Sequence, residues 1–343
     1  MTHIVRIHKT GGPEVLSWEE IELGKPGPGE ARIRQTAVGL NFIDTYNRRG
    51  IYPLTLPSGL GGEAAGIVEE VGSDVTELKP GDRVAYGNAP IGAYAEARLI
   101  PASRLVKLPG GVSDQQAAAM MLKGLTAQYL LRQTYRVKPG DVILIHAAAG
   151  GVGSIASQWA KHLGATVIGT VGSEAKARLA RAHGCDHVID YTKEDFVKRV
   201  AEITAGKKLP VVYDSVGKDT FMKSLDCLAP LGLMVSFGQS SGLVEPFSIN
   251  ILTGKGSLFV TRPTLAHYAT TTEKLRAMAK ELFDLVAAGV IKIEIGQTYK
   301  LKDIAQAHRD LEARKTTGST VLIVSPPTKA SIISVTTASA ARR

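Results

Sequence analysis

Two different patterns of apolar and polar positions divide the chain. Over its first part, short β-type runs such as residues 30–41 and 66–73 are separated by turn sequences rich in glycine and proline, among them KPGPGE, KPGDR and LPGG. This pattern predicts an irregular, partly antiparallel β domain over residues 1–125.

From residue 126 the pattern changes to apolar runs that alternate with helical segments. The helical segments end at glycine or before proline, as helices commonly do. Apolar strands joined by helices are typical of a parallel sheet that is covered on both faces, and six strands match a doubly wound dinucleotide-binding fold. We therefore expect an α/β domain over residues 126–262. Its expected strands are 141–147, 165–171, 187–191, 210–216, 232–238 and 256–262.

The regular alternation ends after residue 262. We expect a long helix over 273–289, a second helix over 302–315 and a strand over 321–324. This last strand is expected to return to the first domain, so that residues 263–325 belong with residues 1–125. Residues 326–343 are rich in Ser, Thr and Ala, and we expect them to form a disordered tail.

Composition narrows the class of protein. The chain has 343 residues, 44% of them apolar and 21% charged, which favours two domains over a single core. We find no apolar segment long enough to cross a bilayer and no secretory signal, so we expect a cytoplasmic protein without membrane contact. The two cysteines, Cys185 and Cys227, are expected to be buried, reduced thiols, and their number excludes a four-cysteine metal site.

The net charge of +9 comes from basic residues that are dispersed along the chain. A general nucleic-acid-binding protein would show a clustered basic stripe with aromatic residues, so the sequence argues against that class. A basic surface would still favour an anionic ligand.

The candidate chemistry lies in the stretch HAAAGGVGS, residues 146–154, between an expected strand and an expected helix. Ala148, Gly150 and Gly153 have the spacing of the dinucleotide fingerprint G-x-G-x-x-G, with alanine in the first place. Gly150 would let the backbone approach a pyrophosphate, Gly153 would let the helix pack closely on the sheet, and Gly151 adds backbone freedom. The helix N-terminus would then offer free N–H groups to the phosphates. The alternative is a tight turn without a ligand.

The type of cofactor is read at the end of the second strand, in TVGSEAK, residues 170–176. An acidic residue there would bind a ribose 2′-OH, but the one acid, Glu174, falls in the first turn of the next helix, where it complements the helix dipole. Gly172 is small, and Ser173 and Lys176 lie on one side of the helix, which suits a 2′-phosphate. We therefore predict NADPH rather than NADH. The alternative is that Lys176 is an ordinary solvated lysine.

These motifs, with VVYDSVG, GLMVSFGQSSG and GSLFVTRP, resemble the quinone oxidoreductases, the zinc-free, ζ-crystallin-like branch of the medium-chain dehydrogenase/reductase superfamily. The first domain agrees at HKTGGPEVL (8–16), 38–53, 56–72 and KPGDRVAY (79–86), so the resemblance covers about residues 1–325. It implies a Rossmann-type doubly wound parallel-sheet domain inserted in a GroES-like, mainly β catalytic domain, with NADPH between them and a homodimer as the assembly.

The resemblance also bears on metal binding. Zinc-dependent relatives carry Cys where this chain has Asn41, and His where it has Gly62. The resemblance therefore implies that no metal is bound, and Glu63 is expected to be a buried or capping carboxylate rather than a ligand.

The residues that would hold NADPH follow from the resemblance and agree with the rule that ligands lie beyond the carboxyl ends of parallel strands. They are Asn41, Phe42, Tyr46 and the backbone near Thr126 at the nicotinamide; Gly150, Gly151, Val152, Gly153, Gly172, Ser173 and Lys176 at the phosphates; Tyr191 at the adenosine; and Ser215, Gly238, Gln239, Phe259, Val260 and Thr261 along the groove. Arg314 resembles the second cofactor cation of the family. Its alternative role is that of a cation interacting with the dipole at a helix C-terminus.

Without a metal to polarise a carbonyl, the substrate must already be electrophilic, as a quinone is. We predict an NADPH:quinone oxidoreductase, with Tyr46, Tyr52 and Arg262 at the substrate pocket to hydrogen-bond a developing phenolate. The alternatives are packing at a domain edge for the tyrosines and an ion pair for Arg262. The run SLFVT, at an expected sheet edge, could pair with a second copy.

Two other functions are kept as hypotheses. One is an NADPH-dependent alkenal or enone double-bond reductase on the same scaffold. The other is an NADPH-responsive RNA-binding or structural protein, because some relatives in this branch are lens proteins or bind AU-rich RNA.

Overall fold

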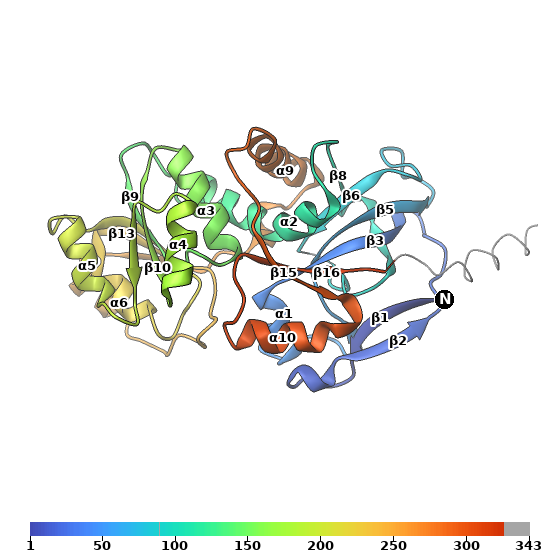
Figure 1. Ribbon diagram of the computed structural model, residues 1–343, viewed down its shortest axis with the longest axis horizontal. Helices are drawn as coiled ribbons and strands as arrows, with labels where there is room; N and C mark the ends of the chain where they lie inside the picture. The colour runs from blue at the N-terminus through green and yellow to red at the C-terminus, as the bar shows by residue number, and fades with distance from the viewer. Residues whose placement is uncertain (89, 326–343) are drawn as a thin grey trace, which may run out of the picture.

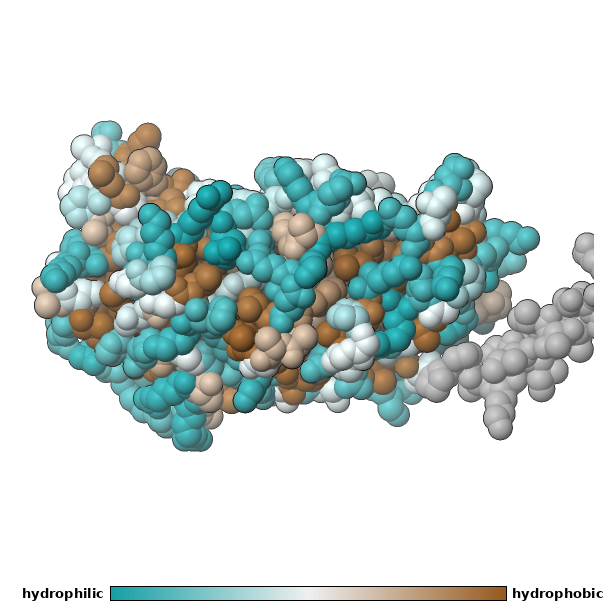
Figure 2. All heavy atoms as spheres, turned by 90° about the horizontal axis from the view of Figure 1, so that it is seen from above, coloured by the Kyte–Doolittle hydropathy of each residue, from teal (hydrophilic) through white to brown (hydrophobic). Residues whose placement is uncertain are grey.

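The computed structural model describes residues 1–88 and 90–325, which form two lobes joined by the helices and strands between them (Figure 1). The predicted tail, residues 326–343, lies outside the described residues. In the described part, no helix is both long enough and apolar enough to span a membrane. Hydrophilic side chains cover most of the face shown in Figure 2, and apolar side chains lie there in separate patches.

One lobe is built on a six-stranded parallel sheet with the order β11-β10-β9-β12-β13-β14. In chain order its strands are β9 (Val142–Ile145), β10 (Thr166–Val171), β11 (His187–Asp190), β12 (Leu209–Asp214), β13 (Leu228–Ser236) and β14 (Phe259–Thr261). The direction in which strands are added reverses between β9 and β12, which leaves a crevice beyond the carboxyl ends of the strands. The predicted doubly wound sheet is confirmed.

Helices cover both faces of this sheet because successive strand residues point to opposite sides. Ile143 and Ile145 pack in one core with Trp159, whereas Leu144 packs in another with Phe196. The helices are α3 (Gly151–His162), α4 (Glu174–Ala182), α5 (Phe196–Ile203) and α6 (Phe221–Asp226), followed by the short α7 (Asn250–Gly254).

The other lobe contains a seven-stranded sheet with the order β15-β16-β3-β5-β6-β8, in which β7 also pairs with β3. Its strands are β3 (Glu30–Leu40), β5 (Glu63–Val71), β6 (Arg83–Gly87), β7 (Ala97–Pro101), β8 (Val106–Lys107), β15 (Ile295–Lys300) and β16 (Ser319–Ile323). A smaller sheet joins β1 (Thr2–Ile7), β2 (Ser17–Ile21) and β4 (Ser58–Gly59). Since β16 pairs antiparallel with β3, the last strand returns to the N-terminal sheet as predicted.

The helices of this lobe differ in part from the prediction. The two late helices are confirmed as α9 (Thr272–Ala287) and α10 (Ile304–Glu312), with the short α8 (Leu265–Tyr268) before them. α10 is preceded by a 3-10 turn (Leu301–Asp303) and ends before Arg314, which has a positive φ of 58°. Two helices, α1 (Phe42–Arg48) and α2 (Asp114–Tyr129), were not predicted from the β-type pattern of residues 1–125.

α2 lies between the two lobes and is buried on most sides (Figure 1). It begins at Ser113, whose hydroxyl accepts the N–H of Gln116 while the Gln116 side chain accepts the N–H of Ser113. Gly124 lets α9 approach closely, because a Cβ there would lie 2.7 Å from Cδ1 of Leu282. The packing of α9 on α2 therefore joins the late part of the chain to the centre of the molecule.

Leu282→Ala is expected to lower the free energy of unfolding by about 2–5 kcal/mol, because Leu282 is fully buried against α2 and its truncation leaves a cavity. Chemical denaturation measures this change. Lys280→Ala, on the exposed side of the same helix, is the control and should change the free energy by less than about 0.5 kcal/mol. Equal effects of the two substitutions would contradict the packing described.

Candidate functional site

The glycine-rich segment joins β9 to α3 at the carboxyl edge of the parallel sheet. Gly150 is the extended N-cap residue of α3, and a Cβ at Gly153 would lie 2.8 Å from Cα of Ala148, so a side chain does not fit there. The N-terminus of α3 has neither a capping side chain nor an acidic residue in its first turn. Its positive end and its free N–H groups therefore remain available to an anion, as a pyrophosphate site requires.

Two parts of the other lobe contact this segment. The N–H of Gly318 donates to the carbonyl oxygen of Ala149 at 3.0 Å, and the stem of Lys123 lies 2.6 Å from the position of a Cβ on Gly151. Residues from both lobes therefore border the place where the phosphates of a dinucleotide would lie.

The residues predicted to bind a 2′-phosphate come together from three segments. Ser173 caps α4 and accepts the N–H of Lys176 at 3.3 Å, and Nζ of Lys176 donates to the carbonyl oxygen of Arg314 at 3.0 Å. A Cβ on Gly172 would lie 2.8 Å from Cζ of Tyr191. Partial burial lowers the pKa of Lys176, and the nearby charge of Arg314 lowers it further. This arrangement can bind a dianion, which would relieve the repulsion between the two cations.

At the opposite end of the groove, the end of β3 places Asn41 over a buried ion pair. Glu63 has no exposed surface, and its Oε2 accepts from Nδ2 of Asn41 at 2.8 Å and from Nζ of Lys123 at 2.7 Å. Its other oxygen, Oε1, accepts the N–H of Leu122 at 2.7 Å. The prediction that Glu63 is a buried carboxylate is confirmed, and its oxygens are engaged by these donors.

The predicted substrate residues also form one cluster. The hydroxyl of Tyr46 accepts the N–H of Gln239 at 3.2 Å, and the rings of Tyr46 and Tyr52 meet edge to face with centroids 5.7 Å apart. Arg262 donates to the Tyr52 hydroxyl at 3.1 Å and to Oε1 of Gln239 at 3.3 Å. Burial raises the pKa of Tyr46 to about 12, which keeps it a neutral phenol. The carbonyl oxygen of Ser236 also accepts from Arg262 at 2.8 Å, so three uncharged oxygens accept hydrogen bonds from this guanidinium.

One polar atom of this cluster lacks a partner. Nε2 of Gln239 is buried and makes no hydrogen bond to any described residue. A buried donor without an acceptor costs free energy, so its position next to Arg262 and Tyr46 marks a place for a ligand oxygen.

The remaining predicted groove residues lie at or near the ends of neighbouring strands. Gly238 packs on Ser215, because a Cβ on Gly238 would lie 2.8 Å from Cα of Ser215. Thr261 ends β14, whereas Phe259 and Val260 lie before it along the exposed edge of the sheet.

Three further predicted residues lie on helices. Phe42 begins α1 and Val152 lies in the first turn of α3. Thr126 lies in the last turn of α2, and its carbonyl oxygen accepts from the N–H of Leu130. The hydroxyl of Thr126 donates to the carbonyl oxygen of Leu122 at 2.7 Å. The contact expected between the backbone near Thr126 and the nicotinamide stays a prediction.

A chain of buried polar groups that the sequence did not reveal runs beneath α1. The guanidinium of Arg48 donates to Nδ1 of His308 at 2.7 Å, Nε2 of His308 lies 3.1 Å from the hydroxyl of Tyr94, and that hydroxyl donates to Oδ2 of Asp44 at 2.7 Å. Because arginine has only donors, Nδ1 of His308 must accept and its Nε2 carries the proton. Oδ2 of Asp44 also accepts the N–H of Asn41 at 2.9 Å.

Two titratable groups of this hydrogen-bonded network, Asp44 and His308, have pKa values shifted in opposite directions. Burial raises the pKa of Asp44 to about 7. Burial, with the adjacent charge of Arg48, lowers the pKa of His308 to about 3. At neutral pH the imidazole is therefore neutral, which agrees with its role as an acceptor from Arg48.

The described residues contain no cluster of side chains that could hold a metal ion, and their two cysteines form no disulfide. Over residues 1–88 and 90–325, no group of three or more His, Cys, Asp or Glu side chains is placed to hold a metal ion. The cysteines are buried and unpaired, as predicted, and burial raises the pKa of Cys185 to about 11 and that of Cys227 to about 12.

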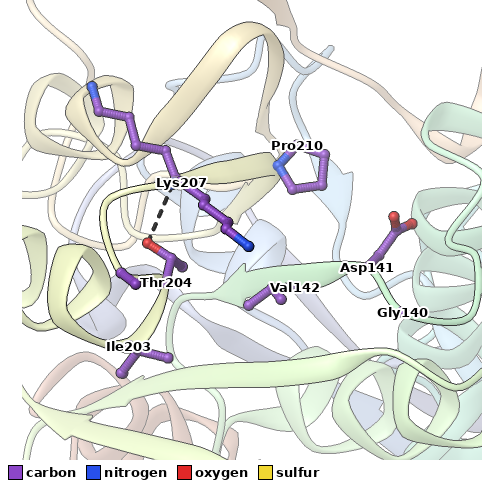
Figure 3. Close-up of a pocket in the computed structure, with 9 residues that line it drawn as sticks. Gly140, Asp141, Val142, Ile203, Thr204, Lys207 and Pro210 are labelled. Atoms are coloured by element: carbon purple, nitrogen blue, oxygen red, sulfur yellow. Dashed lines mark hydrogen bonds between the residues drawn. The ribbon is translucent and has the colours of Figure 1, made fainter.

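A surface hollow of about 470 Å³ lies at the other edge of the parallel sheet, where β9 and β12 begin (Figure 3). Asp141, Thr204 and Lys207 are among its lining residues. The N–H of Lys207 donates to the carbonyl oxygen of Thr204 at 3.0 Å. Since ligands of this fold bind beyond the carboxyl ends of the strands, the hollow is separate from the candidate site.

Comparison with known proteins gives matches over both lobes. Residues 27–110 match the model of an alcohol dehydrogenase GroES-like domain, and residues 151–287 match that of a zinc-binding dehydrogenase. A quinone oxidoreductase of Pseudomonas aeruginosa is 60% identical over 91% of this chain and 97% of its own length. A 2-haloacrylate reductase of a Burkholderia species is 51% identical over 92% of this chain and 97% of its own.

Among solved structures, the quinone oxidoreductase of Escherichia coli in complex with NADPH superposes with a TM-score of 0.92. It is 54% identical, and the match covers 94% of this chain and 99% of that one.

Lys123→Met is expected to lower the free energy of unfolding by about 3–5 kcal/mol, because it leaves the Glu63 carboxylate buried without its cation. Chemical denaturation checks this, and the double variant Glu63→Gln/Lys123→Met should recover much of the loss. Arg132→Met, which breaks a partly exposed pair with Glu281, is the control and should cost less than about 1 kcal/mol. A Lys123→Met protein as stable as the wild type would contradict the assignment.

Asp44→Asn is expected to change how stability depends on pH. Between pH 3.8 and about 7 the folded protein binds a proton on Asp44 that the unfolded chain has released, so this contribution to the free energy of unfolding falls as pH rises. Between about 3 and 6.5 the folded protein lacks a proton on His308 that the unfolded chain binds, so that contribution rises with pH.

The two contributions oppose each other, and the substitution removes the first. Relative to wild type, the free energy of unfolding of Asp44→Asn should rise between pH 4 and 6.5 by up to about 1.4 kcal/mol per pH unit. Denaturant titrations over this range measure it. The exposed control Asp284→Asn should give a curve parallel to wild type, and a parallel curve for Asp44→Asn would refute the shifted pKa.

Proposed function

We infer that this chain, which belongs to the quinone oxidoreductases of the medium-chain dehydrogenase/reductase superfamily, is an NADPH-dependent quinone oxidoreductase. NADPH is favoured over NADH because Ser173, Lys176 and Arg314 lie together beside the end of β10. The two cations, Lys176 and Arg314, and the hydroxyl of Ser173 suit a 2′-phosphate. The end of β10 carries no acidic residue that would bind a ribose 2′-OH instead.

The described residues fit NADPH along the whole groove. The glycines at the start of α3 leave room for a pyrophosphate, and the unpartnered Nε2 of Gln239 offers a donor at the other end. We propose that Tyr191 packs on the adenosine, that Gly150, Gly151, Val152 and Gly153 bind the phosphates, and that Asn41, Phe42, Tyr46 and Thr126 border the nicotinamide. Ser215, Gly238, Gln239, Phe259, Val260 and Thr261 would complete the groove.

NADPH supplies a hydride when it is bound, and the chain supplies position and charge for the acceptor. Arg262 would stabilise the negative charge that develops on a quinone oxygen, since its guanidinium already lies between Tyr52 and Gln239. The Tyr52 hydroxyl accepts from Arg262 and keeps its own proton for a hydrogen bond to that oxygen. Lys123 neutralises Glu63, so the carboxamide of Asn41 is held without placing net charge next to the ring.

A second acceptor class is favoured by one finding. The Burkholderia relative, 51% identical, is a 2-haloacrylate reductase, and a 2-haloacrylate contains a carbon–carbon double bond conjugated with its carboxylate. The same pocket could therefore reduce an enone. The RNA-binding hypothesis stays a prediction: the positive net charge permits contact with RNA but does not argue for it.

We also propose the division of the chain and its assembly. Residues 1–125 and 263–325 would form the catalytic domain, and residues 126–262 the NADPH-binding domain of a cytoplasmic protein. β14 is the outer strand of its sheet, and Phe259 and Val260 on it are 59% and 38% exposed. An apolar, unpaired edge supports a homodimer in which two β14 strands meet.

The experiment that tests the function is an assay of NADPH oxidation with 1,4-benzoquinone, 9,10-phenanthrenequinone and an α,β-unsaturated aldehyde as acceptors. Reduction of the two quinones is expected. Consumption of the aldehyde alone would show that the protein is a double-bond reductase instead.

Lys176→Ala should weaken NADPH binding by about 10- to 100-fold, because it removes a charge-assisted contact to the 2′-phosphate. The affinity for NADH, which lacks this phosphate, should fall by no more than about twofold. Titration calorimetry gives both dissociation constants. Lys207→Ala, in the hollow at the opposite edge of the sheet, is the control and should change neither. Equal losses for NADPH and NADH would show that Lys176 does not contact the 2′-phosphate.

A further inference from the structure

Arg48 is a charged side chain with no exposed surface, and it joins α1 to α10. It lies at the end of α1, two residues after Tyr46. Its Nη2 donates to both carboxylate oxygens of Glu312, at 2.8 and 3.0 Å, and its Nη1 donates to His308. Both acceptors lie on α10, so the pair fixes the end of α10 against α1.

The position of Glu312 gives this contact its significance. It is the last residue of α10, and Arg314 follows two residues later in a left-handed conformation. The N–H of Arg314 donates to Leu311 and that of Lys315 to Asp310, so the turn is built directly on the last turn of α10. The carbonyl oxygen of Arg314 accepts from Lys176.

The segment from Glu312 to Ser319 is held at both ends. At its far end the N–H of Gly318 donates to Ala149 in the glycine-rich segment, and the hydroxyl of Ser319 donates to Ala119 at 2.8 Å. At its other end, Glu312 is anchored to the rest of the lobe by the ion pair with Arg48. Arg314 lies between these anchors, and its Nη2 lies 3.9 Å from Oδ2 of Asp219 in an exposed ion pair. The anchors position the backbone of Arg314, and this ion pair contacts its guanidinium.

A buried arginine is costly to remove from water, and its ion pair with a partly exposed carboxylate repays little of that cost on its own. Apolar residues could join α1 to α10 without this cost. An arginine that reaches Glu312, His308 and the carbonyl oxygen of Gly11 fixes the direction of the helix end more narrowly than apolar contacts would.

We propose that Arg48 and Glu312 are positioning residues for recognition of the 2′-phosphate. By fixing the end of α10 they keep Arg314 beside Lys176, and so they set the preference for NADPH over NADH without touching either cofactor. This inference rests on the proposed role of Arg314 in binding the 2′-phosphate.

Glu312→Gln tests the pair, because Glu312 is partly exposed and the substitution keeps its shape. Binding of adenosine 2′,5′-bisphosphate and of adenosine 5′-monophosphate to the full chain is measured by titration calorimetry, and KM for NADPH and NADH by quinone reduction. The dissociation constant of the bisphosphate and KM for NADPH should rise about fivefold or more. The values for the monophosphate and NADH, and kcat, should stay within about twofold.

The control is Glu281→Gln, which weakens an Arg–Glu pair away from the groove and should alter none of these values. Glu312→Asp, which keeps the charge, should restore part of the preference. If Glu312→Gln weakens both nucleotides equally, or neither, the proposal is overturned and the pair only stabilises the fold.

Arg314→Ala separates this outcome from a failure of the proposed function. If Arg314→Ala weakens the bisphosphate selectively but Glu312→Gln does not, Arg314 binds the phosphate and the positioning role is wrong. If Arg314→Ala affects both nucleotides equally, the assigned role of Arg314 is wrong, and the positioning role falls with it.

Discussion

The buried ion pair between Lys123 and Glu63 is the interaction on which the arrangement of the site depends. The two charges are almost fully withdrawn from water, so each must keep the other as a partner. Through Glu63 the pair orients Asn41 at the end of β3, and through its stem Lys123 lies against Gly151 at the start of α3. One side chain on α2 therefore contacts both the N-terminal sheet, at Glu63, and the glycine-rich turn that is proposed to bind the phosphates.

The two ends of the candidate groove are built from different kinds of groups, backbone at one end and side chains at the other. At the phosphate end, the chain uses backbone: glycines, an uncapped helix N-terminus and a strand that returns to it at Gly318. At the acceptor end it uses side chains with fixed hydrogen bonds, Tyr52 and Gln239 around Arg262. Such preorganised donors suit a reaction in which negative charge develops on an oxygen of an acceptor, such as a quinone, that is electrophilic without polarisation by a metal.

Local patterns allowed much of this to be predicted. The six parallel strands, the turn at Gly150–Gly153 and the pairing of Ser173 with Lys176 depend on residues close in sequence, where periodicity and spacing carry information. α2 was missed because a helix that is buried on most sides shows no polar stripe, although Ser113 and Gln116 give the capping signal. Lys123 was missed with it, and the contact between Arg48 and Glu312 joins residues 264 positions apart, which no spacing rule reaches.

We propose that the groove selects a nicotinamide cofactor by its 2′-phosphate. Titration calorimetry of the wild-type chain with NADPH and with NADH, at moderate ionic strength, measures this selection. We expect one site per chain that binds NADPH at least about tenfold more tightly than NADH. Equal affinities for the two cofactors, or no binding of NADPH, would contradict it.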